Sequence, residues 1–145
     1  MFQHILVAID GSEYSRRALP TAIEVAKKFG SDVYLLHVHE HDRGRAAAYP
    51  LESPTEATKL VAEAIKTARD AGVTADGDVS NVAAGHVAKS IVDTANAKRI
   101  DLIVMGSRGL SDVQGLLLGS VTHKVMQLAT VPVLVDRSTG GEFTG

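Results

Sequence analysis

Glycines and hydroxyl side chains are concentrated in one stretch of the sequence, residues 105–120, which reads M-G-S-R-G-L-S-D-V-Q-G-L-L-L-G-S. The stretch follows an apolar run at residues 102–105 and precedes a helix-like segment, so we expect a strand, a glycine-rich loop and the first turn of a helix. Glycine lets a backbone approach an anion closely, and a helix that begins near Ser120 directs unpaired N–H groups and its positive dipole end toward the same place. This order is typical of a loop that binds phosphate.

Side chains in the same stretch add groups that bind anions. Ser107, Ser111, Ser120 and Thr122 contribute hydroxyl groups, and Arg108 contributes the only positive charge inside the loop. The stretch therefore predicts a polyphosphate ligand. The glycines are also compatible with a simpler structural role, in which they form turns and one of them precedes Ser120 as the N-cap of a helix.

The composition fits one small globular domain. The chain has 145 residues, of which 45% are hydrophobic and 22% are charged, with a net charge of −2 and no cysteine. Acidic and basic residues are mixed along the sequence, which disfavours nucleic acid as a partner. The lack of cysteine excludes disulfides, thiolate metal sites and thiol nucleophiles. We find no signal peptide and no apolar segment long enough to span a membrane, so we expect a cytoplasmic protein.

Apolar runs alternate with segments of helical periodicity along the chain. We expect strands at residues 5–9, 33–38, 73–80, 102–105 and 133–135, and helices at residues 12–29, 54–71, 86–98 and 120–128. The predicted inward residues of the first helix are Ala18, Leu19, Ala22, Val25, Ala26 and Phe29, and those of the last are Val121, Val125, Leu128 and Ala129.

Several helix ends carry recognisable signals. Ser12 is the predicted N-cap of the first helix, and Gly30 is its predicted C-terminal glycine. The sequence S-P-T-E at residues 53–56 forms a capping box with proline at the first helical position. The polar segment 40–51 is predicted to be a surface loop, and the third strand, interrupted by the D-G-D sequence at 76–78, is predicted to lie at or near an edge of the sheet.

This alternation predicts an α/β fold with an open, doubly wound, five-stranded parallel sheet between two layers of helices. In such folds, ligands bind beyond the carboxyl ends of the strands, near the point where the strand order reverses. Asp10 and Gly11 follow the first strand, residues 37–40 follow the second, and the glycine-rich loop follows the fourth. We therefore expect these three segments to meet at one crevice.

Gly106, Gly109, Gly119 and Ser120 form the pattern G-x2-G-x9-G-S. With this pattern the chain resembles the ATP-binding branch of the universal stress protein (UspA-type) family. The resemblance covers residues 1–137 as a single domain, including the segments I-L-V-A-I-D-G-S at 5–12, L-L-H-V at 35–38 and V-P-V-L-V at 131–135. It implies a Rossmann-like three-layer sandwich of the adenine nucleotide alpha hydrolase-like type. Residues 138–145 are expected to form a disordered tail.

The resemblance also implies roles for individual residues. Ala8 and Asp10 would line the adenosine pocket, with Asp10 near the ribose, and Val38 would contact the adenine. The residues implied to surround the ribose and phosphates are Gly106, Ser107, Arg108, Gly109, Gly119, Ser120, Val121 and Thr122. The chain departs from the family pattern after Gly85, where His86 and Val87 replace a common x-Pro helix start, and it has an extra glycine at position 115.

The implied function is that of a nucleotide-loaded regulator in the cellular stress response. The implied ligand is ATP, with AMP or ADP as alternatives and Mg²⁺ as a companion ion. The resemblance implies a homodimer formed by the last strands, and the apolar, short strand at 133–135 would offer an open edge for such pairing. A protein partner is expected to sense the nucleotide occupancy. The rival interpretation is an interaction module of the same family whose nucleotide pocket is not functional.

Other phosphate chemistries fit the sequence less well. The Walker pattern G-x-x-x-x-G-K-[ST] and the dinucleotide pattern G-x-G-x-x-G are both missing, as is the acidic cluster of a phosphoacceptor receiver domain. Arg108, Asp112, His123 and Lys124 do not form the clamp, metal-binding acids and positioned nucleophile that efficient phosphoryl transfer needs. We therefore expect no enzymatic activity beyond slow hydrolysis or autophosphorylation.

Histidines alternate at the end of the second predicted strand. The strand period of two places His37, His39 and His41 on one face, and Asp42 follows them. With Asp42, these histidines could bind a transition metal. One strand end rarely supplies a full coordination shell, and His37 is part of the L-L-H-V segment shared with the family. We therefore expect no metal site of this kind.

Overall fold

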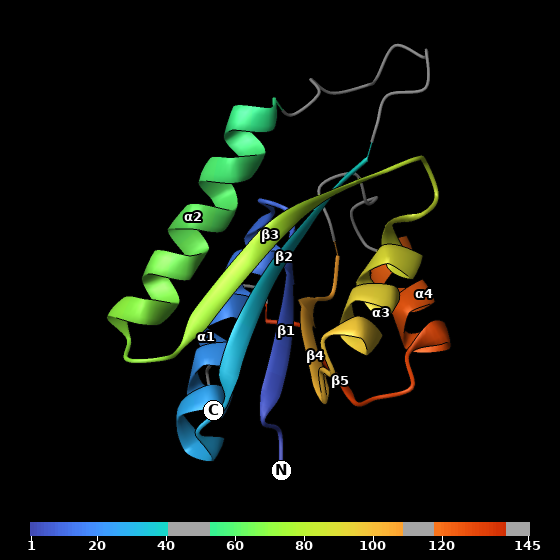
Figure 1. Cartoon of the computed structure of the whole chain (residues 1–145). Helices are drawn as coiled ribbons and strands as arrows, with labels where there is room; N and C mark the ends of the chain where they lie inside the picture. The colour runs from blue at the N-terminus through green and yellow to red at the C-terminus, as the bar shows by residue number, and fades with distance from the viewer. Residues whose placement is uncertain (41–52, 109–117, 139–145) are drawn as a thin grey trace.

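A five-stranded, all-parallel sheet forms the centre of the molecule (Figure 1). The computed structural model describes residues 1–40, 53–108 and 118–138. The strands are β1 (His4–Ile9), β2 (Asp32–Glu40), β3 (Ala75–Val82), β4 (Leu102–Gly106) and β5 (Val133–Asp136), in the order β3-β2-β1-β4-β5. The helices are α1 (Glu13–Phe29), α2 (Pro54–Asp70), α3 (Val87–Ala97) and α4 (Ser120–Leu128). The structure confirms the predicted doubly wound α/β architecture.

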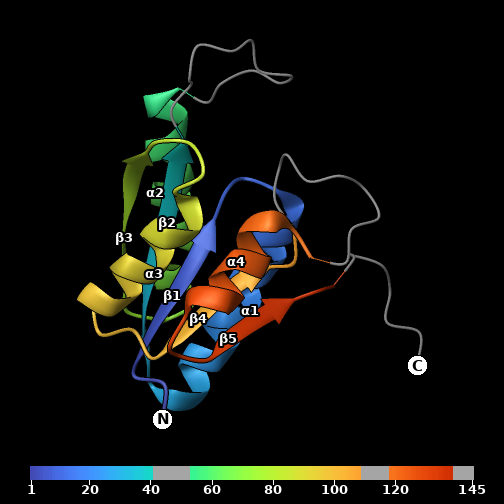
Figure 2. The ribbon, with the colours of Figure 1, turned by 90° about the vertical axis from the view of Figure 1, so that its right-hand side faces the viewer.

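Two layers of helices cover the two faces of the sheet. α1 and α2 pack on one face and α3 and α4 on the other (Figure 1, Figure 2). β1 lies in the middle and contributes to both layers, with Ile5 and Val7 in the core beneath α1 and α2 and Leu6 in the core beneath α3 and α4. All three side chains are fully buried. Burial of a large aliphatic side chain contributes about 1.5–3 kcal/mol, which explains why this run is continuously apolar.

The structure confirms the predicted caps of α1 and α2. Ser12 caps α1, since its Oγ accepts a hydrogen bond of 3.2 Å from the Ser15 N–H. Gly30 ends α1 in the left-handed conformation at φ 67°. Ser53 caps α2 by accepting a hydrogen bond of 3.1 Å from the Glu56 N–H, and Pro54 occupies the first position of the helix. These sequence signals therefore fix both ends of α1 and the start of α2.

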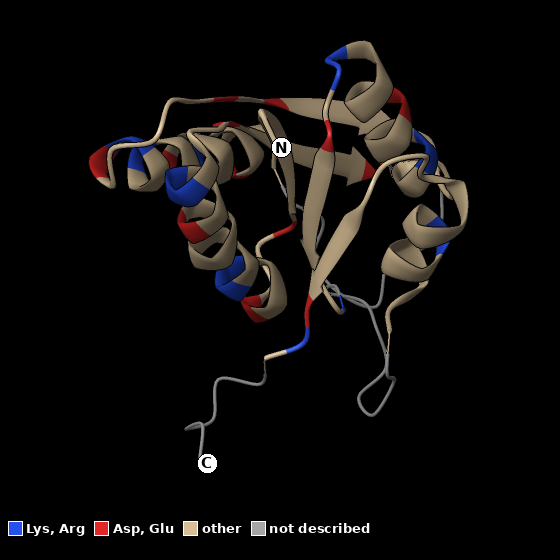
Figure 3. Cartoon of the chain, turned by 90° about the horizontal axis from the view of Figure 1, so that it is seen from below, with Lys and Arg blue, Asp and Glu red and all other residues tan. Residues whose placement is uncertain are grey.

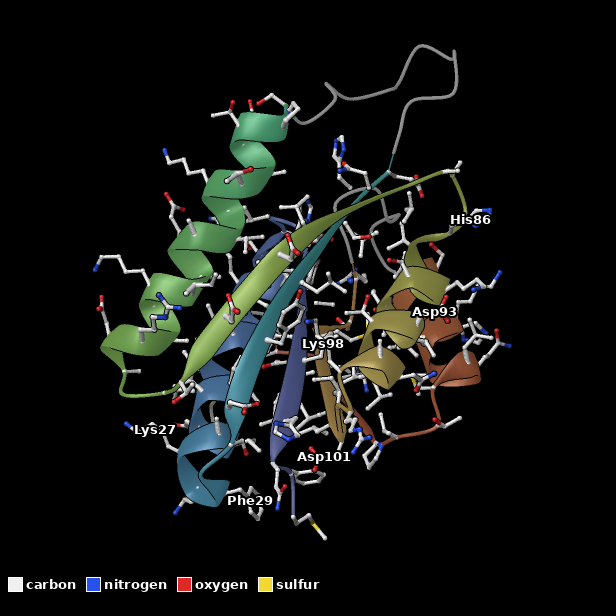
Figure 4. All side chains as sticks on the ribbon, viewed as in Figure 1. Lys27, Phe29, His86, Asp93, Lys98 and Asp101 are labelled. Atoms are coloured by element: carbon white, nitrogen blue, oxygen red, sulfur yellow. The ribbon has the colours of Figure 1, made fainter. Side chains whose placement is uncertain are left out.

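Two residues predicted to lie inside are exposed. Phe29, the last residue of α1, is 49% exposed and meets Phe2 edge-on at 5.3 Å between ring centroids. Figure 4 shows it at the end of the helix away from the carboxyl ends of the strands. A helix of this length runs about 25 Å, further than the short strands β1 and β4 beneath it, so its last turn projects past them. Leu128 is 42% exposed near the end of α4, where Thr122 is buried instead.

The bounds of β3 differ from the prediction, as does the alternative in which Ser120 is the N-cap of α4. β3 begins at Ala75 and ends at Val82, so the D-G-D sequence lies within the strand; β3 is an edge strand, as predicted. α4 begins with Ser120, and its N-cap is Gly119, so Ser120 is not the cap. α3 begins at Val87 after Gly85, which has φ 78°, and its N-cap His86 makes no side-chain capping bond. The replacement of the x-Pro start therefore leaves the helix in place.

Charged side chains lie on the outer faces of the helices. Figure 3 shows Lys and Arg interleaved with Asp and Glu there, while the strands are mostly uncharged. Several of these charges pair one turn apart, as Lys66 does with Asp70 at 2.6 Å. Within the described ranges, none of the helices combines the length and the apolar character that crossing a membrane requires.

Some predictions fall on residues outside the described ranges. These are the surface loop after Glu40, the tail after Ser138, and the middle of the glycine-rich stretch at 109–117. Gly109, Ser111, Asp112 and the extra glycine at 115 belong to that middle part.

Candidate functional site

The strand order reverses between β1 and β4, which lie side by side at the centre of the sheet. Their carboxyl ends lead directly into Asp10 and Ser107. This is the position at which open α/β sheets form their ligand crevice. The structure thus brings together two of the three segments that the sequence predicted to meet, and β2 adds the third on the other side of β1.

The turn after β1 holds Asp10 in a fixed orientation. Its Oδ1 accepts a hydrogen bond of 2.8 Å from the Ser12 N–H, and its own N–H donates to Ser15 Oγ at 3.2 Å. The Ser15 hydroxyl in turn donates to the Ser12 carbonyl at 3.1 Å. Gly11 makes the turn possible with φ 84°. Because the bonds form within one short segment, the Asp10 carboxylate is positioned before any ligand arrives.

Hydrogen bonds also tie the two ends of the glycine-rich stretch together. The Gly119 N–H donates to the Ser107 carbonyl at 2.6 Å, and the Thr122 hydroxyl donates to the Gly106 carbonyl at 2.9 Å. Ser107 and Thr122 are both buried. Their role in the structure is therefore to close the base of the loop, while the exposed Ser120 begins α4 beside them.

Gly106 is required for packing as well as for the loop. A Cβ at this position would lie 2.6 Å from the Tyr14 carbonyl carbon and 2.7 Å from the Tyr14 Cβ. The end of β4 therefore touches the first turn of α1 backbone to backbone. Sequence reasoning assigned Gly106 to the phosphate site and missed this contact, because it joins segments far apart in the chain.

Arg108 lies over the ring of Tyr14. Its Cζ is 4.5 Å from the ring centroid, a distance at which the guanidinium is attracted to the face of the ring. The Nε of Arg108 is buried and has no hydrogen-bond acceptor among the residues that the structure describes. A buried donor without an acceptor is unfavourable by about 1–3 kcal/mol, so an oxygen ligand at this point would be stabilised.

The second strand contributes an apolar wall and a buried histidine. Ala8 and Val38 pack together with the core beneath α3 and α4, and Val121 packs against the same layer. His37 is buried, and its Nδ1 donates to the Ile9 carbonyl at 2.7 Å, which ties β2 to the last residue of β1. Sequence reasoning placed His37 at the crevice and considered it as a metal ligand, but it missed this bond.

The region around the histidines has other partners in the structure. His39 Nδ1 lies 3.3 Å from Asn81 Oδ1 on β3. In the described part of the chain, no three His, Asp or Glu side chains are grouped so that they could hold a metal ion. His41 and Asp42 lie outside the described residues.

Asp136 closes the site on the side of β5. Its carbonyl accepts a hydrogen bond of 3.1 Å from the Ser107 N–H, and its carboxylate accepts one of 2.6 Å from the Thr21 hydroxyl on α1. Burial acts to raise the pKa of Asp136, but hydrogen bonds from Ser138 and Thr21 and the charge of Arg17 together lower that pKa below its ordinary value. Asp136 is thus held as a carboxylate that links β5 to α1.

Comparison with known proteins places this arrangement in a family. The model of the universal stress protein family matches residues 1–137. The universal stress protein YxiE of Bacillus subtilis is 37% identical over an alignment that covers 94% of this chain and all of YxiE. A universal stress protein structure from Archaeoglobus fulgidus superposes with a TM-score of 0.74 at 28% identity, covering 94% of this chain and 95% of the other.

A further solved universal stress protein, in complex with cAMP, is 27% identical and superposes with a TM-score of 0.69 over 95% of this chain and 98% of the other. Sequence and fold therefore agree, and the chain belongs to the universal stress protein family.

Proposed function

We propose that this chain binds an adenine nucleotide at the carboxyl ends of β1 and β4. The observation that carries the proposal is the buried Nε of Arg108, which has no acceptor among the described residues. A phosphate oxygen supplies such an acceptor with a full complementary charge. The related structure in complex with cAMP supports an adenine nucleotide as the ligand class.

In this proposal each segment binds a different part of the nucleotide. The apolar wall of Ala8 and Val38 would take the adenine, and the Asp10 carboxylate would accept hydrogen bonds from the ribose hydroxyls. The phosphates would lie between Arg108 and the first turn of α4, whose N-cap Gly119 places no side chain over the unpaired N–H groups. Each role follows from chemistry that the described residues already present.

ATP is the proposed physiological ligand, with AMP or ADP as alternatives and Mg²⁺ as companion ion. The proposed role is binding without efficient hydrolysis, because the sequence lacks the Walker pattern and does not supply the clamp, metal-binding acids and positioned nucleophile that efficient phosphoryl transfer needs. The protein would act in the cytoplasm as a homodimeric regulator whose nucleotide occupancy is sensed by a protein partner during stress. The competing function is an interaction module with an unused pocket.

Mass spectrometry of nucleotide released from freshly purified protein separates these two functions. Calorimetric titration of ATP, ADP and AMP, with and without Mg²⁺, then ranks the ligands. Co-purified or tightly titrating ATP would support the regulator, and a preference for AMP would change the proposed signal. Protein that binds none of the three would favour the interaction module.

Substitution at the loop tests the location of the site. Gly119→Glu and Gly109→Asp should both abolish ATP binding, because each introduces a carboxylate where the phosphates are proposed to lie. Because Gly119 is buried, thermal unfolding must first establish that its variant is folded. The exposed end of α1 provides a control, since Lys28→Glu makes a larger change in charge far from the site. Folded loop variants with unchanged ATP affinity would refute the proposed location.

A further inference from the structure

Tyr14 joins the two segments that form the candidate site. Its backbone touches Gly106 at the end of β4, where a Cβ would lie 2.6 Å from the Tyr14 carbonyl carbon. This contact fixes the first turn of α1 against the sheet. The Tyr14 ring therefore has a defined position relative to Arg108, which lies two residues beyond Gly106.

Two arginine side chains lie over the ring of Tyr14. The Cζ of Arg108 is 4.5 Å from the ring centroid, and the Cζ of Arg17 is 5.8 Å from it. Arg17 is already bound, since it pairs with Glu13 at 2.8 Å and donates to the Ser138 carbonyl at 2.9 Å. Arg108 is different, because its Nε is buried and has no acceptor among the described residues.

We infer that Tyr14 is a positioning residue that holds Arg108 ready to receive nucleotide phosphate. The inference rests on the proposed function. A long arginine side chain loses conformational freedom when it binds an anion, and prior stacking on an aromatic ring reduces that loss. Tyr14 thus acts on the phosphates through Arg108 and has no role in recognition of the adenosine.

Titrations with ATP and with adenosine test this division. Tyr14→Leu should weaken ATP binding about fivefold, because the guanidinium loses its support, and should leave adenosine affinity unchanged. Tyr14→Phe keeps the ring and should bind ATP as the parent does. Tyr34→Leu is a matched control, since Lys98 lies over the Tyr34 ring at 4.3 Å on the other face of the sheet.

The outcomes separate this inference from the proposed function. A parent protein that binds no ATP would refute the proposed function itself. A parent that binds ATP, with a Tyr14→Leu variant that is unchanged or loses ATP and adenosine equally, would overturn only the role of Tyr14. The Tyr34→Leu control should retain the affinity of the parent for both ligands.

A second and independent observation concerns the two edges of the sheet. In a parallel strand, successive residues point their N–H and C=O groups to opposite sides. On β3, the Thr74 carbonyl accepts from the Val33 N–H of β2, so the alternate residues Ala75, Gly77 and Val79 point their backbone groups outward. These outward groups lie along the β3 edge of the sheet.

Side chains of this chain already bind one outward backbone group of each of these three residues. The Ala75 carbonyl accepts from Arg69 Nε at 3.0 Å. The Gly77 N–H donates to the carboxylate of Asp76 at 2.8 Å, and the Val79 N–H donates to that of Asp78 at 2.9 Å. One backbone group at each of three successive outward positions is thus bound without a further strand. Both aspartates are exposed, so another chain that approached this edge would also meet two negative charges.

The opposite edge, β5, has no such covering. Pro132 and Asp136 direct their carbonyls to β4, so Val133 and Val135 point outward. Within the described ranges, no side chain binds the backbone groups of these two valines. The geometry points to a sheet whose β3 edge is closed to the addition of a further strand by the side chains of Arg69, Asp76 and Asp78.

The double variant Asp76→Ala/Asp78→Ala tests the closed edge. Light scattering should give a mass that rises with concentration beyond that of the parent, because Gly77 and Val79 would offer free N–H groups to other chains. Asp76→Asn/Asp78→Asn keeps an oxygen acceptor at each position and should keep the mass of the parent. Asp70→Ala/Asp93→Ala removes the same charge from helices α2 and α3 and should also keep it (Figure 4).

Two results would contradict the closed edge. If the alanine variant keeps the mass of the parent, the side-chain bonds are not what prevents association at β3. If the asparagine variant associates as strongly as the alanine variant, charge and not hydrogen bonding protects the edge.

Discussion

At the residue scale, Gly106 links the packing of the fold to the candidate site. Gly106→Ala should lower the free energy of unfolding by about 3 kcal/mol, because the new methyl group would collide with the Tyr14 backbone, which is not free to move aside. Urea unfolding measures the change. Gly30→Asn is the control, since its Cβ meets no atom within 4 Å and asparagine tolerates the left-handed conformation there. Equal losses in the two variants would show that the close approach at Gly106 is unimportant.

His4 gives the stability a defined pH dependence. Its Nδ1 is 2.8 Å from Asp32 Oδ1, and this hydrogen bond, with the charges of Asp32 and Asp101, raises the pKa of His4 above its ordinary value of 6.5. The contribution is therefore fully present below pH 6.5 and is lost as the pH rises through the raised pKa. Because both side chains are about half exposed, the gain should not exceed about 0.5 kcal/mol.

Unfolding free energies of the parent and His4→Gln, measured at pH 5 and pH 8.5, test this dependence. The difference between the two proteins should be larger at pH 5. His123→Gln, at an exposed position on α4, should behave as the parent does at both pH values. A difference for His4→Gln that does not change with pH would mean that protonation of His4 adds no stability to its pair with Asp32.

Individual residues were also where prediction from sequence reached its limit. The spacing of Gly106, Gly119 and Ser120 was sufficient to propose a candidate site, because glycines and helix starts are local signals. The contacts of Tyr14 with Gly106 and Arg108 were not predictable, since they depend on how β4 packs against α1. Phe29 was misplaced for a related reason, because helical spacing gives the face of a residue but not whether the sheet extends beneath it.

At the element scale, the cap of α2 is the clearest case of a sequence signal with an energetic consequence. Ser53→Ala should lower the free energy of unfolding by about 1 kcal/mol, because the Glu56 N–H loses its acceptor. Thr58→Ala removes a hydroxyl from the same helix, where it only donates to the Pro54 carbonyl, and should have little effect. Thermal or urea unfolding of the two variants provides the comparison, and equal effects would argue against the cap.

Strongly apolar elements were the easiest to predict. The runs that became β1 and β4 are buried on both faces, so nearly every residue is apolar and the pattern has one interpretation. β3 was placed two residues too early, because Asp76 and Asp78 resemble a break in a strand when read locally. In the structure they lie on the exposed side of an edge strand, where acidic residues are favourable.

At the scale of the whole molecule, the β5 edge should determine the oligomeric state. Val135 points its N–H away from β4, so Val135→Pro removes a donor from the open edge without breaking a bond inside the sheet. The proposed dimer should dissociate to folded monomers, which sedimentation or light scattering would detect, with circular dichroism as the check on folding.

The same substitution at the other edge isolates the cause. Val79→Pro also removes an outward N–H from an edge strand, but that donor is already bound to Asp78, so the dimer should persist. Both valines are partly buried, so the loss of packing is comparable in the two variants. A folded Val135→Pro variant that remains dimeric would mean that the copies meet elsewhere. A Val79→Pro variant that dissociates would mean that dimerisation depends on the stability of the whole sheet and not on the β5 edge.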